Sequence, residues 1–219
     1  MVWMIKLVIF DAGELLFPLP RDLWAKKISE LEEKYKVPQG RCVKAWGEVK
    51  PLIMEVKINY LDAQEMIFKK AGFGEHARNV SLEWIDTYNE LRNTMQPFKG
   101  VKETLHQLKR DYKLAVLSDT HKTESEKRKG LKHMGIDFFD KVFCSNDLGV
   151  HKPNPEAYQK VLDYFNVTPH EAVFVAHDCK ELEGAKNVGI KTISVNEKCH
   201  ADFHANMFSD IITFLKEIK

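Results

Sequence analysis

Two patterns of apolar residues alternate along most of the chain. Short runs of consecutive apolar residues that stop at polar ones predict buried strands at residues 5–10, 113–118, 141–144, 172–176 and 191–195. Segments whose apolar positions recur every three or four residues predict helices at residues 100–110, 122–134, 155–165, 181–188 and 208–218. Strands that alternate with helices are typical of an α/β fold, here a Rossmann-like parallel sheet with helices on both faces.

Residues 18–96 interrupt this alternation. They contain no strand-like run, and their periodicity predicts helices at 21–36, 40–57, 60–71 and 81–93. Prolines mark both crossings, Pro18 and Pro20 at the start and Pro97 at the end. We therefore expect an α/β core domain of residues 1–17 and 97–219, with an inserted all-helical domain of residues 18–96.

The charge balance excludes some classes of partner. The chain of 219 residues has 33 Lys and Arg against 32 Asp and Glu, so no net field attracts nucleic acid or an anionic membrane surface. No apolar run approaches the ~20 residues that cross a bilayer. Residues 1–7 lack the features of a secretory signal, so we expect a cytoplasmic protein.

The cysteines suggest neither a disulfide framework nor a metal centre. Cys42, Cys144, Cys179 and Cys199 form no C-x-x-C pair, and a chain of this length folds without disulfides, so we expect free thiols. Cys199 with the nearby histidines resembles zinc spacing only loosely, and we expect no transition-metal site there.

Polar side chains follow several of the strand-like runs. Asp11, Ser118 and Asp178 come at or just after such runs, and Lys152 lies in a further segment, Gly149–Pro153, that we also interpret as strand-like. The carboxyl ends of parallel strands meet at one edge of a sheet, where ligands bind. Two carboxylates, a hydroxyl and an ammonium at that edge are suited to an anionic substrate. Taken singly, each has an ordinary structural alternative, such as capping a turn or a helix start.

The order of these residues resembles the four motifs of the haloacid dehalogenase superfamily. The motifs are carried by Asp11, by Ser118, by the segment KPNPEAY from Lys152 to Tyr158, and by Asp178 followed by Glu181. The resemblance implies that the helical insert is a C1-type cap over the active site. It also implies that Asp11 is the nucleophile, that Lys152 neutralises the crowded charges, and that Ser118 binds a phosphoryl oxygen.

The resemblance further implies a turn at Asp119 that helps to bind phosphate, and a Mg²⁺ site. The metal ligands would be Asp11, the backbone carbonyl of Gly13, and Asp178. Glu181 is three residues from Asp178 and can lie on the same helix face, where it would support the site or simply balance the helix dipole. Oxygen ligands of this kind suit Mg²⁺, whose octahedron a substrate phosphate can complete.

Two departures from the motifs limit the functional prediction. Gly13 stands where phosphatases of the superfamily carry a second Asp, the general acid and base, and Glu14 is adjacent but should point the other way. The fourth motif has the short spacing of the metal-free L-2-haloacid dehalogenase branch, in which Asn matches Asp178. A dehalogenase would also need a cap arginine to hold the halide, for which Arg21 and Arg41 are candidates.

Because Asp178 restores a charge beside Asp11 that a cation would neutralise, we favour a Mg²⁺-dependent phosphatase. It would hydrolyse a small phosphomonoester through an aspartyl-phosphate intermediate. The alternatives are a dehalogenase that forms an aspartyl ester on Asp11, and a catalytically weak protein of the same superfamily that binds a ligand.

Overall fold

The computed structural model describes residues 4–54, 58–196 and 198–218. Its centre is a six-stranded sheet in the order β3-β2-β1-β4-β5-β6, with every pair of neighbours parallel. The strands are β1 (Leu7–Phe10), β2 (Lys113–Ser118), β3 (Lys141–Cys144), β4 (Ala172–Ala176), β5 (Lys191–Val195) and β6 (Phe203–Ala205). The predicted fold class, a parallel α/β sheet with helices, is confirmed.

The register of the central strands brings their carboxyl ends to one edge. Phe10, the last residue of β1, lies level with Val116 of β2 and Val175 of β4. The backbone N–H of Asp11 then donates to Val175 O at 2.9 Å, so the pairing continues one residue past the strand. The residues that follow β1, β2 and β4 therefore lie close to one another at this edge of the sheet.

Helices cover both faces of the sheet, and alternate residues of each strand face opposite cores. Val8 and Phe10 pack with α5 (Val101–Leu108) and α10 (Asp210–Glu217), whereas Leu7 and Ile9 pack with α8 (Pro155–Phe165) and α9 (Cys179–Asn187). The other α-helices that follow residue 100 are α6 (Glu124–His133) and α7 (Ser145–Leu148).

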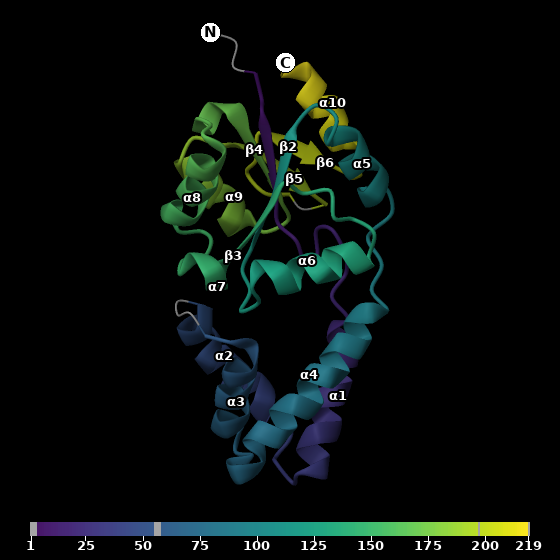
Figure 1. Ribbon diagram of the computed structural model, residues 1–219, viewed down its shortest axis with the longest axis vertical. Coiled ribbons are helices and arrows are strands. Elements are labelled where there is room, and N and C mark those ends of the chain that lie inside the picture. The colour runs from purple at the N-terminus through teal and green to yellow at the C-terminus, as the bar shows by residue number, and fades with distance from the viewer. Residues whose placement is uncertain (1–3, 55–57, 197, 219) are drawn as a thin grey trace.

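Four helices between β1 and α5 form a separate group, which we call the helical block. They are α1 (Arg21–Lys34), α2 (Arg41–Met54), α3 (Tyr60–Ala71) and α4 (Ala77–Asn93). Their apolar faces meet in a core of their own, which includes Ile53, Phe68 and Val80. Figure 1 shows the block at one end of the molecule, with α6 and α7 lying between it and the sheet.

Some local predictions were wrong. Gly149–Pro153 is not a strand, because α7 ends at Leu148 and the chain then runs as a loop into α8. The short strand β6 and the four-residue helix α7 were not predicted, since neither is long enough to show a period. The helix expected over 40–57 begins at Arg41, and its last three residues lie outside the described part of the chain.

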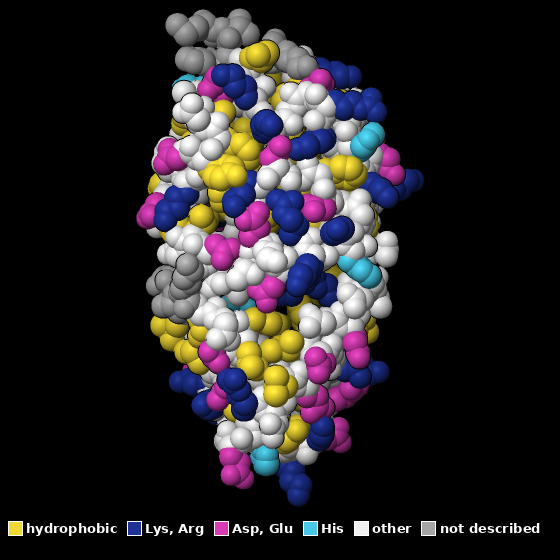
Figure 2. All heavy atoms as spheres, in the orientation of Figure 1, with side chains coloured by type: hydrophobic (Ala, Val, Ile, Leu, Met, Phe, Trp, Pro, Cys, Tyr) yellow, Lys and Arg dark blue, Asp and Glu magenta, His cyan; other side chains and the backbone are white. Residues whose placement is uncertain are grey.

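Within the described ranges, no helix is long and apolar enough to cross a membrane. Figure 2 shows basic and acidic side chains interspersed on the face it presents, which agrees with the formal net charge of +1.

Candidate active site

Three ionisable side chains from distant parts of the sequence meet at the carboxyl edge of the sheet. Lys152 Nζ lies 2.6 Å from Asp11 Oδ1 and 2.8 Å from Glu181 Oε2. The Lys152 side chain is fully buried, and Asp11 is 7 % exposed. The carboxylate that follows β1 is thus held by an ammonium group that follows α7.

The loop that carries Lys152 is fixed on several sides. Its backbone N–H donates to Asp119 Oδ1 at 3.1 Å, and Asn154 caps the start of α8 by accepting from Glu156 N at 2.9 Å. The Lys152–Pro153 peptide bond is cis. Gly184 of α9 lies against this loop, and a Cβ there would come within 2.7 Å of Pro153 O. The absence of a side chain at position 184 therefore lets α9 approach the loop and bring Glu181 to Lys152.

Electrostatics sets the protonation states of this cluster. Burial disfavours the ionised form of Asp11, but the Lys152 ammonium and hydrogen bonds outweigh it and hold the pKa of Asp11 below its usual range. Burial likewise opposes the charge of Lys152, and the neighbouring carboxylates of Asp11 and Glu181 raise its pKa nevertheless. Burial raises the pKa of Glu181 to about 7, against the attraction of Lys152. Asp11 is therefore ionised at neutral pH, as a carboxylate nucleophile requires.

His177 is a neighbour of Asp11 to which the sequence analysis assigned no role beside the nucleophile. Its Nδ1 lies 3.5 Å from Asp11 Oδ2, an ion-pair distance that is long for a hydrogen bond. The contact with the Asp11 carboxylate raises the pKa of the half-buried imidazole. Its position directly after β4 was the available signal, because β4 ends beside β1 and the next residue must emerge near Asp11.

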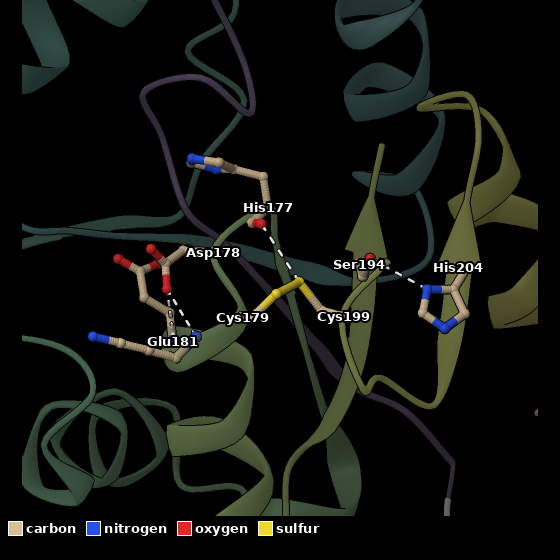
Figure 3. Close-up of a disulfide and its surroundings, with 8 residues drawn as sticks. His177, Asp178, Cys179, Glu181, Ser194, Cys199 and His204 are labelled. Atoms are coloured by element: carbon tan, nitrogen blue, oxygen red, sulfur yellow. Dashed lines mark hydrogen bonds between the residues drawn. A yellow bond between two sulfur atoms is a disulfide. The ribbon is translucent and has the colours of Figure 1, made fainter. Parts of the chain in front are cut away.

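Asp178 begins α9 rather than contacting Lys152. Its Oδ1 accepts from the backbone N–H groups of Lys180 at 2.8 Å and Glu181 at 3.2 Å, which is an N-cap arrangement. Figure 3 shows the Asp178 and Glu181 side chains close together on one side of the α9 start, with the His177 ring extending in another direction. Asp178 is exposed, so its carboxylate is open to a ligand.

A disulfide joins the start of α9, next to Asp178, to the segment between β5 and β6. Cys179, the first residue of α9, is bonded to Cys199, which lies between β5 and β6, with Cα atoms 5.1 Å apart (Figure 3). Cys199 Sγ is also 3.7 Å from His177 O. The prediction of free thiols is wrong for this pair, because it took no account of β4 and β5 being neighbours that deliver the two residues side by side. Cys42 and Cys144 are free and buried.

Gly13 and Glu14 lie in the turn that leaves β1. Gly13 forms an isolated bridge with Phe17. Glu14 adopts a φ of 61°, and its Oε1 accepts from Leu19 N at 2.9 Å and from Arg21 Nε at 3.3 Å. The Glu14 carboxylate thus stabilises the segment that leads into α1.

Ser118 ends β2 and is 4 % exposed, beside the Asp119 that orients the Lys152 backbone. The two arginines considered as halide ligands lie elsewhere, since Arg21 pairs with Glu14 and Arg41 donates to Ala71 O inside the helical block at 3.3 Å. No group of three or more His, Cys, Asp or Glu side chains suited to a metal ion occurs in the parts of the chain that the structure describes.

The chain belongs to the haloacid dehalogenase-like hydrolase family, whose model matches residues 54–195. It is accordingly a hydrolase of that class.

Individual relatives include phosphatases. The glyceraldehyde 3-phosphate phosphatase of Pyrococcus furiosus is 28% identical over 198 residues, which cover 86% of this chain and 80% of the relative. The pyrophosphatase PpaX of Halalkalibacterium halodurans is 32% identical over 116 residues, 52% of this chain and 53% of the relative. Among solved structures, a 2-haloacid dehalogenase from Pseudomonas syringae pv. Tomato DC3000 superposes with a TM-score of 0.78 over 99% of this chain and all of the other. At 21% identity that likeness concerns the fold alone.

Proposed function

We propose that the chain is a Mg²⁺-dependent phosphatase that hydrolyses a small phosphomonoester through an aspartyl-phosphate on Asp11. The observation that carries the proposal is the Asp11 carboxylate, ionised and held by Lys152 at 2.6 Å at the carboxyl edge of the sheet. The names of the relatives, a phosphatase and a pyrophosphatase, support the hydrolysis of a small phosphorylated substrate.

In the first step an oxygen of Asp11 attacks the phosphorus atom, and the bond from phosphorus to the ester oxygen breaks. The electron pair leaves with the alkoxide, which must then take up a proton. Lys152 keeps Asp11 deprotonated and offsets the negative charge that gathers around the phosphoryl group. Ser118 and the backbone of the turn at Asp119 would bind phosphoryl oxygens. Water then hydrolyses the acyl phosphate, which returns the Asp11 carboxylate and releases inorganic phosphate.

The residues at this edge fit a Mg²⁺ ion by the chemistry of their donors. Asp11, the Gly13 carbonyl and Asp178 are hard oxygen ligands, and Mg²⁺ is commonly bound by one or two carboxylates with water and substrate phosphate completing its shell. When bound, the ion would supply positive charge to the phosphoryl oxygens. Asp178 is exposed and already oriented by the start of α9, which suits it to this role.

We further propose that residues 18–96, which contain the helical block, act as a cap domain on a core of residues 1–17 and 97–219. Contacts between the two parts support this arrangement. Ile58 N, beyond α2, donates to Asn146 Oδ1 of α7 at 3.2 Å, and the ring of Tyr60 in α3 stacks on His121 at 4.4 Å. The helical block therefore lies over the loops that follow β2 and β3, where it can exclude water and select substrates.

The proposal is tested with an aryl phosphate, with and without Mg²⁺, in the wild type and in Asp11→Asn. We expect Mg²⁺-stimulated release of phosphate by the wild type and none by the variant, because an amide cannot form the acyl phosphate. The variant should stay folded, since Lys152 keeps its partner Glu181 at 2.8 Å. Retained turnover in Asp11→Asn would refute the assignment. Chloride release from a 2-haloacid would favour the dehalogenase, and silence in both assays a binding protein.

A further inference from the structure

A second group of basic side chains lies between the helical block and the core. A small cavity there is lined by Arg92 of α4 and by Lys122 and Lys127, which lie just before and within α6. Phe17, from the segment that follows Asp11, and Thr120, two residues past Ser118, line the same cavity. Segments that follow β1 and β2, the strands that carry Asp11 and Ser118, thus contribute to the lining of this cavity, and the Asp11 carboxylate acts electrostatically on the Lys127 ammonium.

Lys122 is buried without a carboxylate partner. It is 6 % exposed, and its Nζ lies 4.3 Å from the ring centre of Tyr88 and 5.3 Å from that of Tyr60. Such cation–π contacts stabilise an ammonium group only partly, because the charge itself remains unneutralised. Burial and the positive charges of Arg92 and Lys127 lower the pKa of Lys122 to about 7.

Arg92 reaches this cavity through a space left by a glycine. Its Nη2 donates to the carbonyl oxygens of Glu126 at 3.1 Å and Lys127 at 3.3 Å. Gly130 lies beneath the guanidinium, and a Cβ at that position would come within 1.5 Å of Nη2. A glycine inside a helix is unfavourable relative to alanine. Here it allows a cation from the helical block to lie against α6.

The carboxylates nearby in the sequence are engaged elsewhere. Glu126 accepts from Thr123 N and Thr123 Oγ1, both at 2.8 Å, in the capping box of α6. Other cations of the same region are paired, for Arg128 lies 2.6 Å from Asp137 and Lys141 lies 2.6 Å from Glu124. Among the described residues, no ion pair joins a carboxylate to Arg92, Lys122 or Lys127. Glu126 acts on Lys122, and Asp11 on Lys127, without forming an ion pair. Three cations that line a cavity without a carboxylate in direct contact are suited to an anion brought by the ligand.

We propose that Arg92, Lys122 and Lys127 bind a second anionic group of the substrate, so that the preferred substrates are small phosphomonoesters that also carry a carboxylate or another phosphoryl group. This inference rests on the proposed phosphatase function. The cavity leaves about 40 Å³ for the centres of water molecules. One water needs roughly 10–15 Å³ of such space, so the cavity has room for a group of carboxylate size.

The test compares two substrates that differ only in the second charge. Phosphoglycolate carries a carboxylate where ethyl phosphate has a methyl group. We expect the wild type to have a kcat/KM for phosphoglycolate at least about tenfold higher than for ethyl phosphate, because charged hydrogen bonds in a buried site typically contribute a factor of ten or more. In Lys122→Met the ratio of the two values should fall about tenfold or more.

Two further variants separate charge from structure. Gly130→Ala removes no charge but forces the Arg92 guanidinium from its place, so the ratio should fall as it does in Lys122→Met. Lys129→Met removes an exposed lysine of the same helix and should leave both values unchanged. A wild type that hydrolyses both esters equally well would overturn the inference while leaving the phosphatase proposal intact. So would a Lys122→Met variant that loses both activities in equal proportion.

A wild type that hydrolyses neither alkyl ester leaves the phosphatase proposal to the aryl phosphate assay, and binding then tests the anion site. Calorimetric titration with phosphoglycolate and with ethyl phosphate should show the tighter binding of phosphoglycolate in the wild type and its loss in Lys122→Met. Equal affinities of the wild type for the two esters would overturn the anion site.

Discussion

Replacing Gly13 by aspartate should supply the general acid that the proposed reaction lacks. The leaving alkoxide needs a proton, and Gly13 has none to give. A positioned general acid typically contributes about 10²–10⁴ in rate, which corresponds to roughly 3–5 kcal/mol of barrier. The wild type should therefore hydrolyse aryl phosphates, whose leaving groups need little protonation, much faster than alkyl phosphates.

The structure indicates that the position can accept a side chain. Gly13 does not have a positive φ, and the three atoms nearest to a Cβ there all belong to the Leu19 side chain, the first of them Cδ1 at 3.3 Å. A shift of that side chain by a few tenths of an ångström costs about 1 kcal/mol or less. The expected gain in barrier exceeds this cost, so the substitution should raise alkyl phosphate turnover at least about tenfold.

The assay is the ratio of kcat values for nitrophenyl phosphate and ethyl phosphate in the wild type and Gly13→Asp. Gly13→Asn serves as the control, since it has nearly the same shape and cannot donate a carboxylic proton. We expect the ratio to fall only in Gly13→Asp. A wild type that already hydrolyses ethyl phosphate as fast as the aryl ester would refute the reasoning. His177, beside Asp11, would then be the first residue to test, because Glu14 is held by Leu19 N and Arg21.

Three further predictions concern the metal, the disulfide and the buried lysine. Asp178→Asn, which keeps an oxygen to cap α9, should weaken Mg²⁺ binding in calorimetry more than Glu181→Gln does, and equal losses would contradict the ligand assignment. Cys199→Ser should lower the free energy of unfolding by about 3 kcal/mol, from the closure of a loop with a sequence separation of 20, and reductant should have the same effect on the wild type but none on the variant. Lys122→Met should raise the free energy of unfolding at pH 7 by about 1–4 kcal/mol, because an unpaired buried cation is replaced by an apolar group. Since the folded-state pKa of Lys122 is about 7 against 10.5 in the unfolded chain, the wild type gains stability as pH rises through this window, so the advantage of the variant in urea unfolding should shrink towards pH 10.

The sheet could be predicted from the sequence because its strands are buried on both faces. Each of the runs that became β1, β2 and β4 is apolar at nearly every position, which is the pattern of a central parallel strand. The same reasoning failed for Gly149–Pro153, where the motif suggested a strand. The tertiary structure places that segment in a loop that packs on Gly184, and no local pattern reports such a contact.

Only those residues of the candidate site that lie at or near the ends of strands could be predicted from the sequence. Asp11 comes directly after an apolar run, Ser118 ends one, and Asp178 lies two residues past one, so their common location follows from the topology of a parallel sheet. Arg92 gave no comparable signal, because it lies on a helix of the insert and its distance from α6 depends on how the helical block rests on the core. The Cys179–Cys199 pair was missed for a related reason, since it depends on the order of strands β4 and β5 in the sheet.

The positions of the cations link substrate choice to the contact between the two parts of the molecule. Arg92 belongs to α4, whereas Lys122 and Lys127 belong to the segment around α6, so the like charges face one another across the boundary. Without a ligand their repulsion opposes the contact, and burial, together with that repulsion, lowers the pKa of Lys122. An anion between them would convert the repulsion into attraction on both sides. A substrate with a second anionic group would thus favour the arrangement in which α4 lies against α6, whereas a substrate with one phosphoryl group would leave the repulsion in place. Binding energy from a part of the substrate remote from the phosphorus atom would in this way help to assemble the site where Asp11 reacts.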